Sequence, residues 1–256
     1  MLNLNFVDNE RSRVRSLRDT VSEFAVVVNL QMNLKNNDTF KPLINDLEAK
    51  LAEIEAWLGR EQLDLSVEGR QKKAREEAKR LKSSFKALVA AGRKKRLEFK
   101  KRREDYANLE FSDKFPPEMR IEIRATFAKI KGAGPQFDFA IKADLRTLSA
   151  ILETGPAMSD LPSDLYHKLQ DRHAVLKLVD RAATTGSHDL KPSLSDILAV
   201  GIDTDRAISD AEKTVKSWVA EEAIIDDLSQ YLEGVVNWTA LLTNTNNADA
   251  FEMLMA

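Results

Sequence analysis

The residues best suited to metal chemistry in this sequence stand at unfavourable spacings. His167 and His173 are six positions apart, which on a helix places them on different sides and not at the i, i+4 spacing of shared ligands. Asp164 and His167 have a usable i, i+3 spacing, but a surface hydrogen bond is the simpler interpretation of that pair. The stretch EEAIIDD, residues 221–227, lacks the Glu-x-x-His pairs of a helical di-metal site. We therefore predict no metal site and no cofactor.

Signatures of the common enzyme classes do not occur either. KGAGPQ, residues 131–136, has two glycines but neither the lysine spacing of a phosphate-binding loop nor a preceding strand pattern, and it favours a linker between helices. There is no G-x-S-x-G and no H-E-x-x-H. Cysteine is absent, which excludes disulfides, thiolate metal sites and cysteine nucleophiles. We predict that the protein is not an enzyme.

The remaining chemistry is that of charge, concentrated in GRKKRLEFKKRR, residues 92–103. Eight of the eleven residues from Arg93 to Arg103 are Lys or Arg, in two tetrads seven positions apart. Three interpretations compete: a solvated helix end, a dock for an acidic protein surface, and a contact with a nucleic-acid backbone. The predicted anion- or partner-binding residues are Arg93, Lys94, Lys95, Arg96, Lys100, Lys101, Arg102 and Arg103.

The formal net charge of −2 conceals a strong asymmetry along the chain. Residues 69–110 contain sixteen Lys and Arg against six Asp and Glu, whereas residues 203–256 contain three against eleven. This division predicts either complementarity between two arms or separate surfaces for two partners. The acidic partner of the basic stretch could be this protein's own C-terminal arm or that of another copy, so a homo-oligomer is possible.

Nucleic-acid binding is the alternative function. Arg and Lys clustered along one helix would contact phosphates, with a strong dependence on salt. The sequence lacks a helix-turn-helix glycine turn, zinc ligands and the aromatic motif of an RNA-recognition domain. Phe99 and Tyr106 fit core positions of a coiled coil better than base-stacking positions. Any binding of DNA or RNA is therefore predicted to be independent of sequence.

Hydrophobic spacing predicts the helices that must position the basic stretch. A first helix is expected over residues 9–34 and a second from the Asn36–Thr39 cluster to Gly59, each with one apolar face. The apolar positions of these two faces are Val14, Leu17, Val21, Phe24 (or Ala25), Val28 and Met32, then Ile44, Leu47, Leu51, Ile54 and Leu58.

A third and longest helix, from about residue 66 to residue 110, keeps an a/d heptad register for about six heptads. Lys95 and Arg102 occupy d positions of this register, where Leu81 and Leu88 stood earlier. Burying those charges against an apolar helix would be costly. The register therefore predicts that the helix either protrudes or meets an acidic or anionic partner at this level.

Phe115-Pro116-Pro117 is the strongest boundary in the chain, because two prolines end one helix and can start another. It divides the chain into a helical coiled-coil hairpin domain, residues 1–112, and a helical bundle with an acidic C-terminal arm, residues 117–256. Helices are expected in the second part over residues 117–131, 138–153, 162–183, 192–200 and 203–233. FDFAI, residues 137–141, is the best strand candidate, but it continues into a helical pattern. We predict an all-α fold.

Composition agrees with a folded chain of this class. The 256 residues are 43% hydrophobic and 31% charged, and the low content of glycine (nine) and proline (seven) favours helices over hairpins. The first residues lack the order of a secretory signal, and no apolar run is long enough to span a bilayer. We expect a cytoplasmic protein without membrane association.

These observations predict a non-enzymatic, α-helical interaction or structural subunit of a larger protein complex. Its coiled-coil arm and basic patch would dock an acidic partner. The alternative is an accessory subunit that contacts the phosphates of DNA or RNA through residues 93–103.

Overall fold

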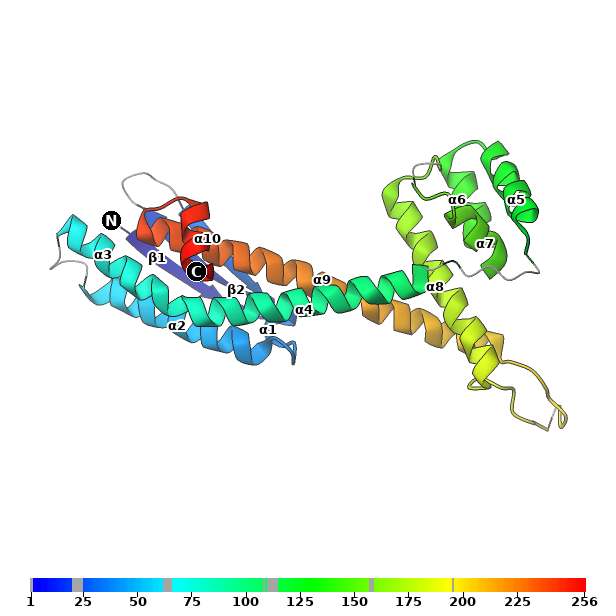
Figure 1. The fold of residues 1–256 in the computed structure, drawn as a ribbon. Helices are drawn as coiled ribbons and strands as arrows, with labels where there is room; N and C mark the ends of the chain where they lie inside the picture. Colours follow the sequence, from blue (N-terminus) through cyan, green and yellow to red (C-terminus); the bar gives the residue numbers. More distant parts are fainter. Residues whose placement is uncertain are drawn as a thin grey trace. The chain divides into compact units, whose positions relative to one another are not determined.

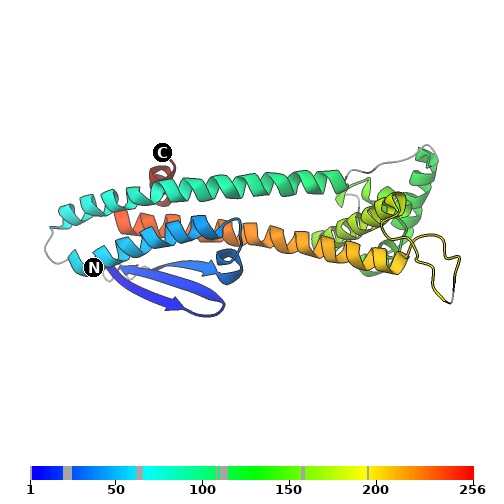
Figure 2. The ribbon, with the colours of Figure 1, turned by 90° about the horizontal axis from the view of Figure 1, so that it is seen from below.

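The computed structural model of the chain describes residues 2–19, 25–61, 66–107, 109, 115–156, 159–194 and 196–256. These residues are mostly helical, with one small antiparallel sheet (Figure 1, Figure 2). The prediction of a helical protein is thus confirmed in its coarse form, whereas the expected lack of strands is wrong and the coiled-coil hairpin is not confirmed. The elements are β1 (Leu2–Asp8), β2 (Ser12–Asp19), β3 (Ala25–Gln31), α1 (Met32–Lys35), α2 (Lys41–Glu61), α3 (Val67–Ala78), η1 (Lys79–Leu81), α4 (Lys82–Ala107), α5 (Pro117–Lys129), α6 (Ala133–Ile141), α7 (Leu145–Leu152), α8 (Ser163–Thr185), α9 (Thr204–Thr243) and α10 (Asn247–Met255).

The sheet, with strand order β1-β2-β3, replaces the helix predicted over residues 9–34. In β3 the side chains alternate, with Val26, Val28 and Leu30 buried and the residues between them exposed. This period of two, in a run rich in β-branched valines, favours a strand over the helix that the wider spacing suggested. Of the predicted helical face, Val21 and Phe24 lie outside the described residues.

A side chain forms the turn between β1 and β2. The Asn9 side-chain Oδ1 accepts hydrogen bonds from the backbone N–H groups of Arg11 (2.9 Å) and Ser12 (2.8 Å). This is the local bonding by which asparagine favours turns over helix. The first residues of the helix predicted from residue 9 therefore form a turn instead.

The described residues form two compact units. Unit 1 combines Met1–Glu98 with Glu221–Ala256, and unit 2 is Phe99–Ala220. This grouping differs from the two domains predicted from sequence, residues 1–112 and 117–256. The linker of that prediction falls mostly on residues 110–114, which lie outside the described residues, so the predicted boundary stays a prediction.

The core of unit 1 joins the sheet to helices from both ends of the chain. The predicted apolar face of α2 is confirmed, because each of its five positions is buried. Tyr231, Val235 and Trp238 of α9 are fully buried as well. Many positions of the predicted heptad register of the third helix are buried in α3 and α4. The helix was expected to be continuous, but η1 interrupts it. The buried register positions are Ala74, Ala78, Leu81, Phe85, Leu88, Gly92 and Phe99.

Unit 2 has a helical core made by α5, α6, α7 and α8. As predicted, α5 begins at Pro117, and FDFAI is helical. The helix expected over residues 138–153 is wrong in its bounds, because α6 already begins at Ala133, within the expected linker, and a break after Ile141 separates it from α7. Asp144 caps α7 by accepting a hydrogen bond from the N–H of Thr147 (2.8 Å). The core residues are Phe127, Ala140, Leu148, Ile151, Leu152, Leu161, Tyr166 and Leu169.

The short helix predicted over residues 192–200 is wrong for the residues described there. An isolated bridge between Asp189 and Ile202 closes the base of a loop, and Ser193 and Asp196 form a turn within it. Leu194 is 99% exposed and Val200 91%, so these apolar side chains do not pack against the rest of the described chain. Without such packing, a helix this short is not stable.

Among the described residues, no helix combines the length and the apolar character needed to cross a membrane.

Candidate interaction surface

The eight predicted site residues lie on one helix, α4, in two groups. Six of them have exposed side chains, and the two d-position residues, Lys95 and Arg102, are partly buried. Phe99, between the tetrads, is buried. The helix therefore turns its predicted core side inward and most of the predicted cations outward.

In the first tetrad, within unit 1, one cation is engaged and three face solvent. The Nζ atom of Lys95 is 3.0 Å from Oε2 of Glu98, one turn further along α4. No carboxylate among the described residues pairs with Arg93, Lys94 or Arg96. These three exposed side chains remain able to pair with groups from outside the chain.

In the second tetrad, within unit 2, three of the four cations have partners. The Nζ atom of Lys100 is 3.8 Å from Oε1 of Glu104, and Nη1 of Arg103 is 3.5 Å from Oδ1 of Asp171 on α8. The guanidinium of Arg102 lies over the rings of Phe99 and Trp218, 5.3 Å from each centroid. Lys101 is exposed.

The stacking of Arg102 on aromatic rings explains how the fold accommodates a charged side chain at a d position of the register. The ring of Trp218 on α9 also packs on Tyr106, at 4.8 Å between centroids. Aromatic faces attract a guanidinium and accept its flat surface. The sequence predicted a protruding helix or an anionic partner here. Trp218 was missed because it lies far along the chain and its helical spacing marked it as an ordinary core residue.

A single aliphatic side chain interrupts the exposed cations of α4. Leu97 is 67% exposed. It follows Arg93 by four positions and precedes Lys101 by four, so the three share one side of the helix. We call the exposed residues Arg93, Lys94, Arg96, Leu97 and Lys101 the basic surface of α4. It can offer several charge-assisted hydrogen bonds around one apolar contact.

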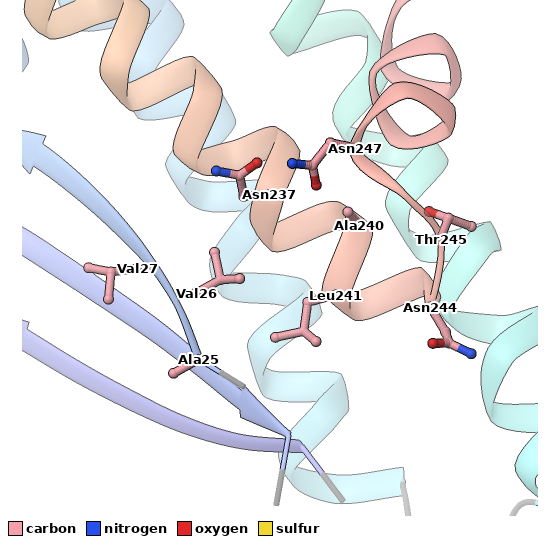
Figure 3. A pocket seen from close by; sticks show the side chains of 9 residues that line it. All are labelled: Ala25, Val26, Val27, Asn237, Ala240, Leu241, Asn244, Thr245 and Asn247. Carbon is pink, nitrogen blue, oxygen red and sulfur yellow. The ribbon is translucent and has the colours of Figure 1, made fainter. Parts of the chain in front are cut away.

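Unit 1 also contains a groove beside the end of β3 (Figure 3). Its volume is about 420 Å³. The strand forms one wall, and α9 with the turn that follows it forms the other. The lining residues are Ala25, Val26, Val27, Asn237, Ala240, Leu241, Asn244, Thr245 and Asn247. None of them is charged.

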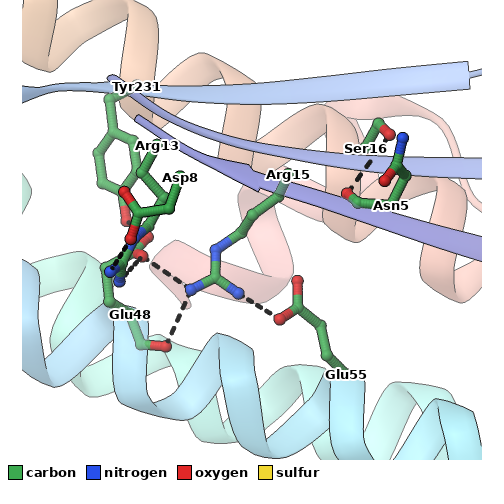
Figure 4. Close-up of polar contacts among 8 residues, drawn as sticks. All are labelled: Asn5, Asp8, Arg13, Arg15, Ser16, Glu48, Glu55 and Tyr231. Carbon is green, nitrogen blue, oxygen red and sulfur yellow. Dashed lines mark hydrogen bonds and ion pairs between the residues drawn. The ribbon is translucent and has the colours of Figure 1, made fainter. Parts of the chain in front are cut away.

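A buried polar cluster ties the sheet of unit 1 to its helices (Figure 4). Glu48 of α2 accepts hydrogen bonds from Nη2 of Arg15 (2.7 Å) and from the hydroxyl of Tyr231 (2.7 Å). Arg15 also pairs with Glu55, and Arg13 reaches both Glu48 (3.4 Å) and Asp8 (2.6 Å). Each of the carboxylates of this cluster is held by an arginine of β2.

The electrostatics of this cluster fix its protonation states. Burial disfavours the charge of Arg15, but Glu48 and Glu55 outweigh that effect and raise its pKa. Burial, reinforced by Glu48, raises the pKa of Tyr231 well above 10, so its hydroxyl stays protonated and donates. The hydrogen bond from Arg13 lowers the pKa of Asp8. These shifts favour the charged forms of Arg15 and Asp8 and the protonated form of Tyr231.

Two serine–histidine contacts occur among the described residues: an exposed one between Ser187 and His188 (3.0 Å), and one between Ser149 and His173 of unit 2, which is buried. The His173 Nε2 atom is 3.0 Å from the Ser149 hydroxyl, and Nδ1 is 3.1 Å from the carbonyl oxygen of Tyr106, which requires the proton on Nδ1. Burial, with Lys177 nearby, lowers the pKa of His173 to about 4. Both side chains are buried, and we interpret the pair as a structural contact.

The other histidines have local partners. His167 Nδ1 is 3.0 Å from Oε1 of Gln170 and does not pair with Asp164 as the spacing suggested. His188 Nε2 is 3.3 Å from Oδ2 of Asp210. Within the described ranges, no group of three or more His, Asp or Glu side chains is placed to hold a metal ion.

Comparison with protein-family models, with curated proteins and with solved structures gives no significant match.

Proposed function

We propose that this chain is a non-enzymatic interaction subunit that docks an acidic partner protein on the basic surface of α4. The observation that supports this most directly is the exposure of Arg93, Lys94, Arg96 and Lys101 around Leu97, with no ion pair within 4.0 Å from any of the four to a carboxylate of the described residues. Like charges that are close on a helix repel one another. The carboxylates of a partner would relieve that repulsion.

Leu97 favours a protein partner over a nucleic acid. A phosphate backbone would pair with the cations but would leave the leucine without an apolar contact. An acidic protein surface that carries aliphatic side chains would satisfy both, as the apolar centres and polar rims of protein interfaces do. In addition, Arg102 and Arg103 make intramolecular contacts, which reduces the number of cations available to phosphates.

The test compares two variants with equal charge. In the first, Arg93, Lys94, Arg96 and Lys101 are each replaced by Glu. In the matched control, the exposed Lys41, Lys72, Arg75 and Lys79 are replaced by Glu, so that both variants have a formal net charge of −10 in place of −2. Fluorescence anisotropy measures binding of a labelled helical peptide with glutamates around a leucine stripe, of a generic DNA duplex and of a single strand, over a range of salt concentration.

We expect the acidic peptide to bind the unmodified protein and the control. Its affinity for the first variant should fall by about tenfold or more, as expected when four charge pairs are lost. If the duplex or single strand binds more tightly than the peptide, with a steep salt dependence that the first variant abolishes, the nucleic-acid function replaces this proposal. If none of the three probes binds at low salt, the basic surface is only a solvated helix face and the proposal is wrong.

A further inference from the structure

The outer edge of β3 presents backbone groups that no strand of the described residues pairs. The N–H of Asn9 donates to the carbonyl of Ser12 (3.1 Å), and the N–H of Met32 donates to the carbonyl of Arg11 (3.0 Å). Because hydrogen-bonded pairs alternate in an antiparallel ladder, these two bonds set the pattern of the whole sheet. Val26, Val28 and Leu30 bond to β2. The backbone groups of Ala25, Val27 and Asn29 therefore point away from it.

Helix α9 closes one part of this edge and leaves the other part open. A Cβ atom on Gly234 would lie 3.3 Å from Cα of Val28 and 3.4 Å from the carbonyl oxygen of Val27, so helix and strand are in close contact there. Further along α9, the space between helix and strand is the groove at Ala25 and Val27 (Figure 3). Within the described residues, no hydrogen bond engages the backbone N–H of Ala25 or that of Val27.

The wall opposite the strand carries amide side chains. Asn237 comes from α9, and Asn244 and Asn247 come from the turn into α10 and its first residue. None of these three side chains makes a hydrogen bond to another described residue. The neighbouring Asn246, in contrast, caps α10, because its Oδ1 accepts a hydrogen bond from the backbone N–H of Asp249 (2.8 Å). A carboxamide has both donors and an acceptor, as a peptide group does.

We propose that this groove binds an extended, uncharged peptide segment of a partner protein, which adds as a strand to the edge of β3. One edge of the peptide bonds to the backbone of Ala25 and to the N–H of Val27, because the carbonyl oxygen of Val27 lies against Gly234. The other edge faces α9 and the turn after it, where Asn237 and Asn244 line the groove. Alternate side chains of the peptide contact Leu241 and Val26. This is the β-augmentation mode, in which main-chain bonds supply affinity and side-chain contacts supply specificity.

The chemistry of the lining decides between classes of ligand. With no charged side chain among the described residues that line the groove, a phosphate, a nucleotide or a metal ion would find no counter-charge on them. A purely apolar ligand would bury the N–H groups of the strand edge without partners. A neutral chain of alternating donors and acceptors satisfies both walls. An exposed strand edge is also a known template for pairing with another chain.

This site is separate from the basic surface of α4 and does not depend on its function. It would bind its peptide even if α4 bound nothing. The test can therefore be done on the full chain and also on the variant with four glutamates on α4, where the peptide should bind with unchanged affinity.

The probe is the blocked peptide Ac-Val-Thr-Val-Thr-Val-NH2, with the same peptide methylated at every backbone nitrogen as control. Calorimetric titration gives the affinity, and NMR-detected hydrogen exchange reports on single amides. Two variants remove protein groups without disturbing the ladder. A25P removes an outward N–H at the first residue of an edge strand, where proline is tolerated, and A25S is its control. The double variant N237A/N244G removes two amides, and glycine suits the positive φ of 53° at position 244.

We expect the unmodified peptide to slow exchange of the Ala25 and Val27 N–H groups at least about tenfold and to leave that of Val28 unchanged. The affinity should fall about fivefold to tenfold in A25P and in N237A/N244G, and it should be kept in A25S. The proposal is overturned if the methylated peptide binds equally well, or if millimolar peptide does not protect those two amides. It is also overturned if N-methylacetamide protects them as strongly as the peptide does, because the groove would then be a site for small amides.

Discussion

At the scale of single residues, Glu48 organises unit 1. It is 5% exposed and accepts hydrogen bonds from a strand arginine and from a tyrosine that lies 183 positions further along the chain. A carboxylate buried this deeply is tolerated only when it is paired and hydrogen-bonded. Its removal would leave the guanidinium of Arg15, itself 3% exposed, with Glu55 as its remaining close carboxylate.

Replacing Glu48 by Ala should therefore reduce the free energy of unfolding by about 3–5 kcal/mol, the usual effect of breaking a buried ion pair. Tyr231→Phe, which removes one neutral donor, should cost about 1–3 kcal/mol. Urea denaturation measures both, and Glu53→Gln on the exposed side of α2 is the control, with little expected change. A loss below about 1 kcal/mol for Glu48→Ala would show that the cluster does not stabilise the unit.

His173 gives unit 2 a dependence on pH. Its pKa in the folded chain is about 4, below its ordinary value of 6.5, because of burial and the nearby Lys177, and the hydrogen bond to the Tyr106 carbonyl opposes the shift only in part. The unfolded chain therefore binds the proton first. The contribution of His173 to the stability of the folded chain is complete above pH 6.5 and is lost as the pH falls toward 4, by about 3 kcal/mol in all.

The variant His173→Gln, which cannot titrate, should show a weaker loss of stability than the unmodified protein between pH 6.5 and pH 4.5. His167→Gln on the exposed side of the same helix is the control, and its pH profile should follow that of the unmodified protein. Parallel profiles for His173→Gln and the unmodified protein would contradict the assigned pKa.

At the scale of elements, the contact between α9 and the sheet requires a glycine. Alanine normally stabilises a helix interior by about 0.5–1 kcal/mol relative to glycine. At Gly234, however, the new methyl would press on the backbone of Val27 and Val28, which cannot move aside as a flexible side chain can. At Gly134 in α6, no atom lies within 4 Å of a new Cβ.

Gly234→Ala should therefore destabilise the protein by about 1–3 kcal/mol, as overpacking does, and Gly134→Ala should leave its stability equal or slightly higher. Thermal and urea unfolding of the two variants measure the difference. Equal stabilisation by both would mean that helix and strand are further apart than the structure shows.

The elements also show what a sequence can and cannot reveal. The face of α2 and the proline start of α5 were predictable, because they depend on local spacing and local backbone chemistry. The strands were missed because apolar residues that alternate along β2 and β3 also fell at helical intervals. The partner of Arg102 was out of reach, since only the fold brings Trp218 to it. Nothing in the sequence marked the groove, which depends on the backbone of β3 and on amides from the distant end of α9.

At the scale of the whole molecule, unit 1 draws on both ends of the chain. Residues 1–98 and 221–256 form it together, and unit 2 is the continuous segment between them. The most exposed apolar residues of the described chain lie on the loop between α8 and α9, where Leu194, Ile197, Leu198 and Val200 are 71–99% exposed. Exposed loops of this kind are the first sites of proteolysis.

Brief treatment with thermolysin should cleave first between residues 190 and 200, and the two fragments should still elute together in native gel filtration. Each fragment contributes a necessary part of unit 1, including one partner of the Tyr231–Glu48 hydrogen bond. The fragments should separate in urea. Separation without denaturant would contradict the shared core of unit 1.

The same arrangement has a consequence for how the protein is made. The ribosome releases the sheet and α2 before α9, and they emerge with Val26, Val28 and Leu30 uncovered and with Glu48 lacking the hydrogen bond from Tyr231. The part of α9 that packs on the sheet is synthesised only after unit 2. The apolar side of the sheet therefore stays uncovered while unit 2 is being made, and a chain that stops before α9 exposes it to the chaperones and proteases of the cell.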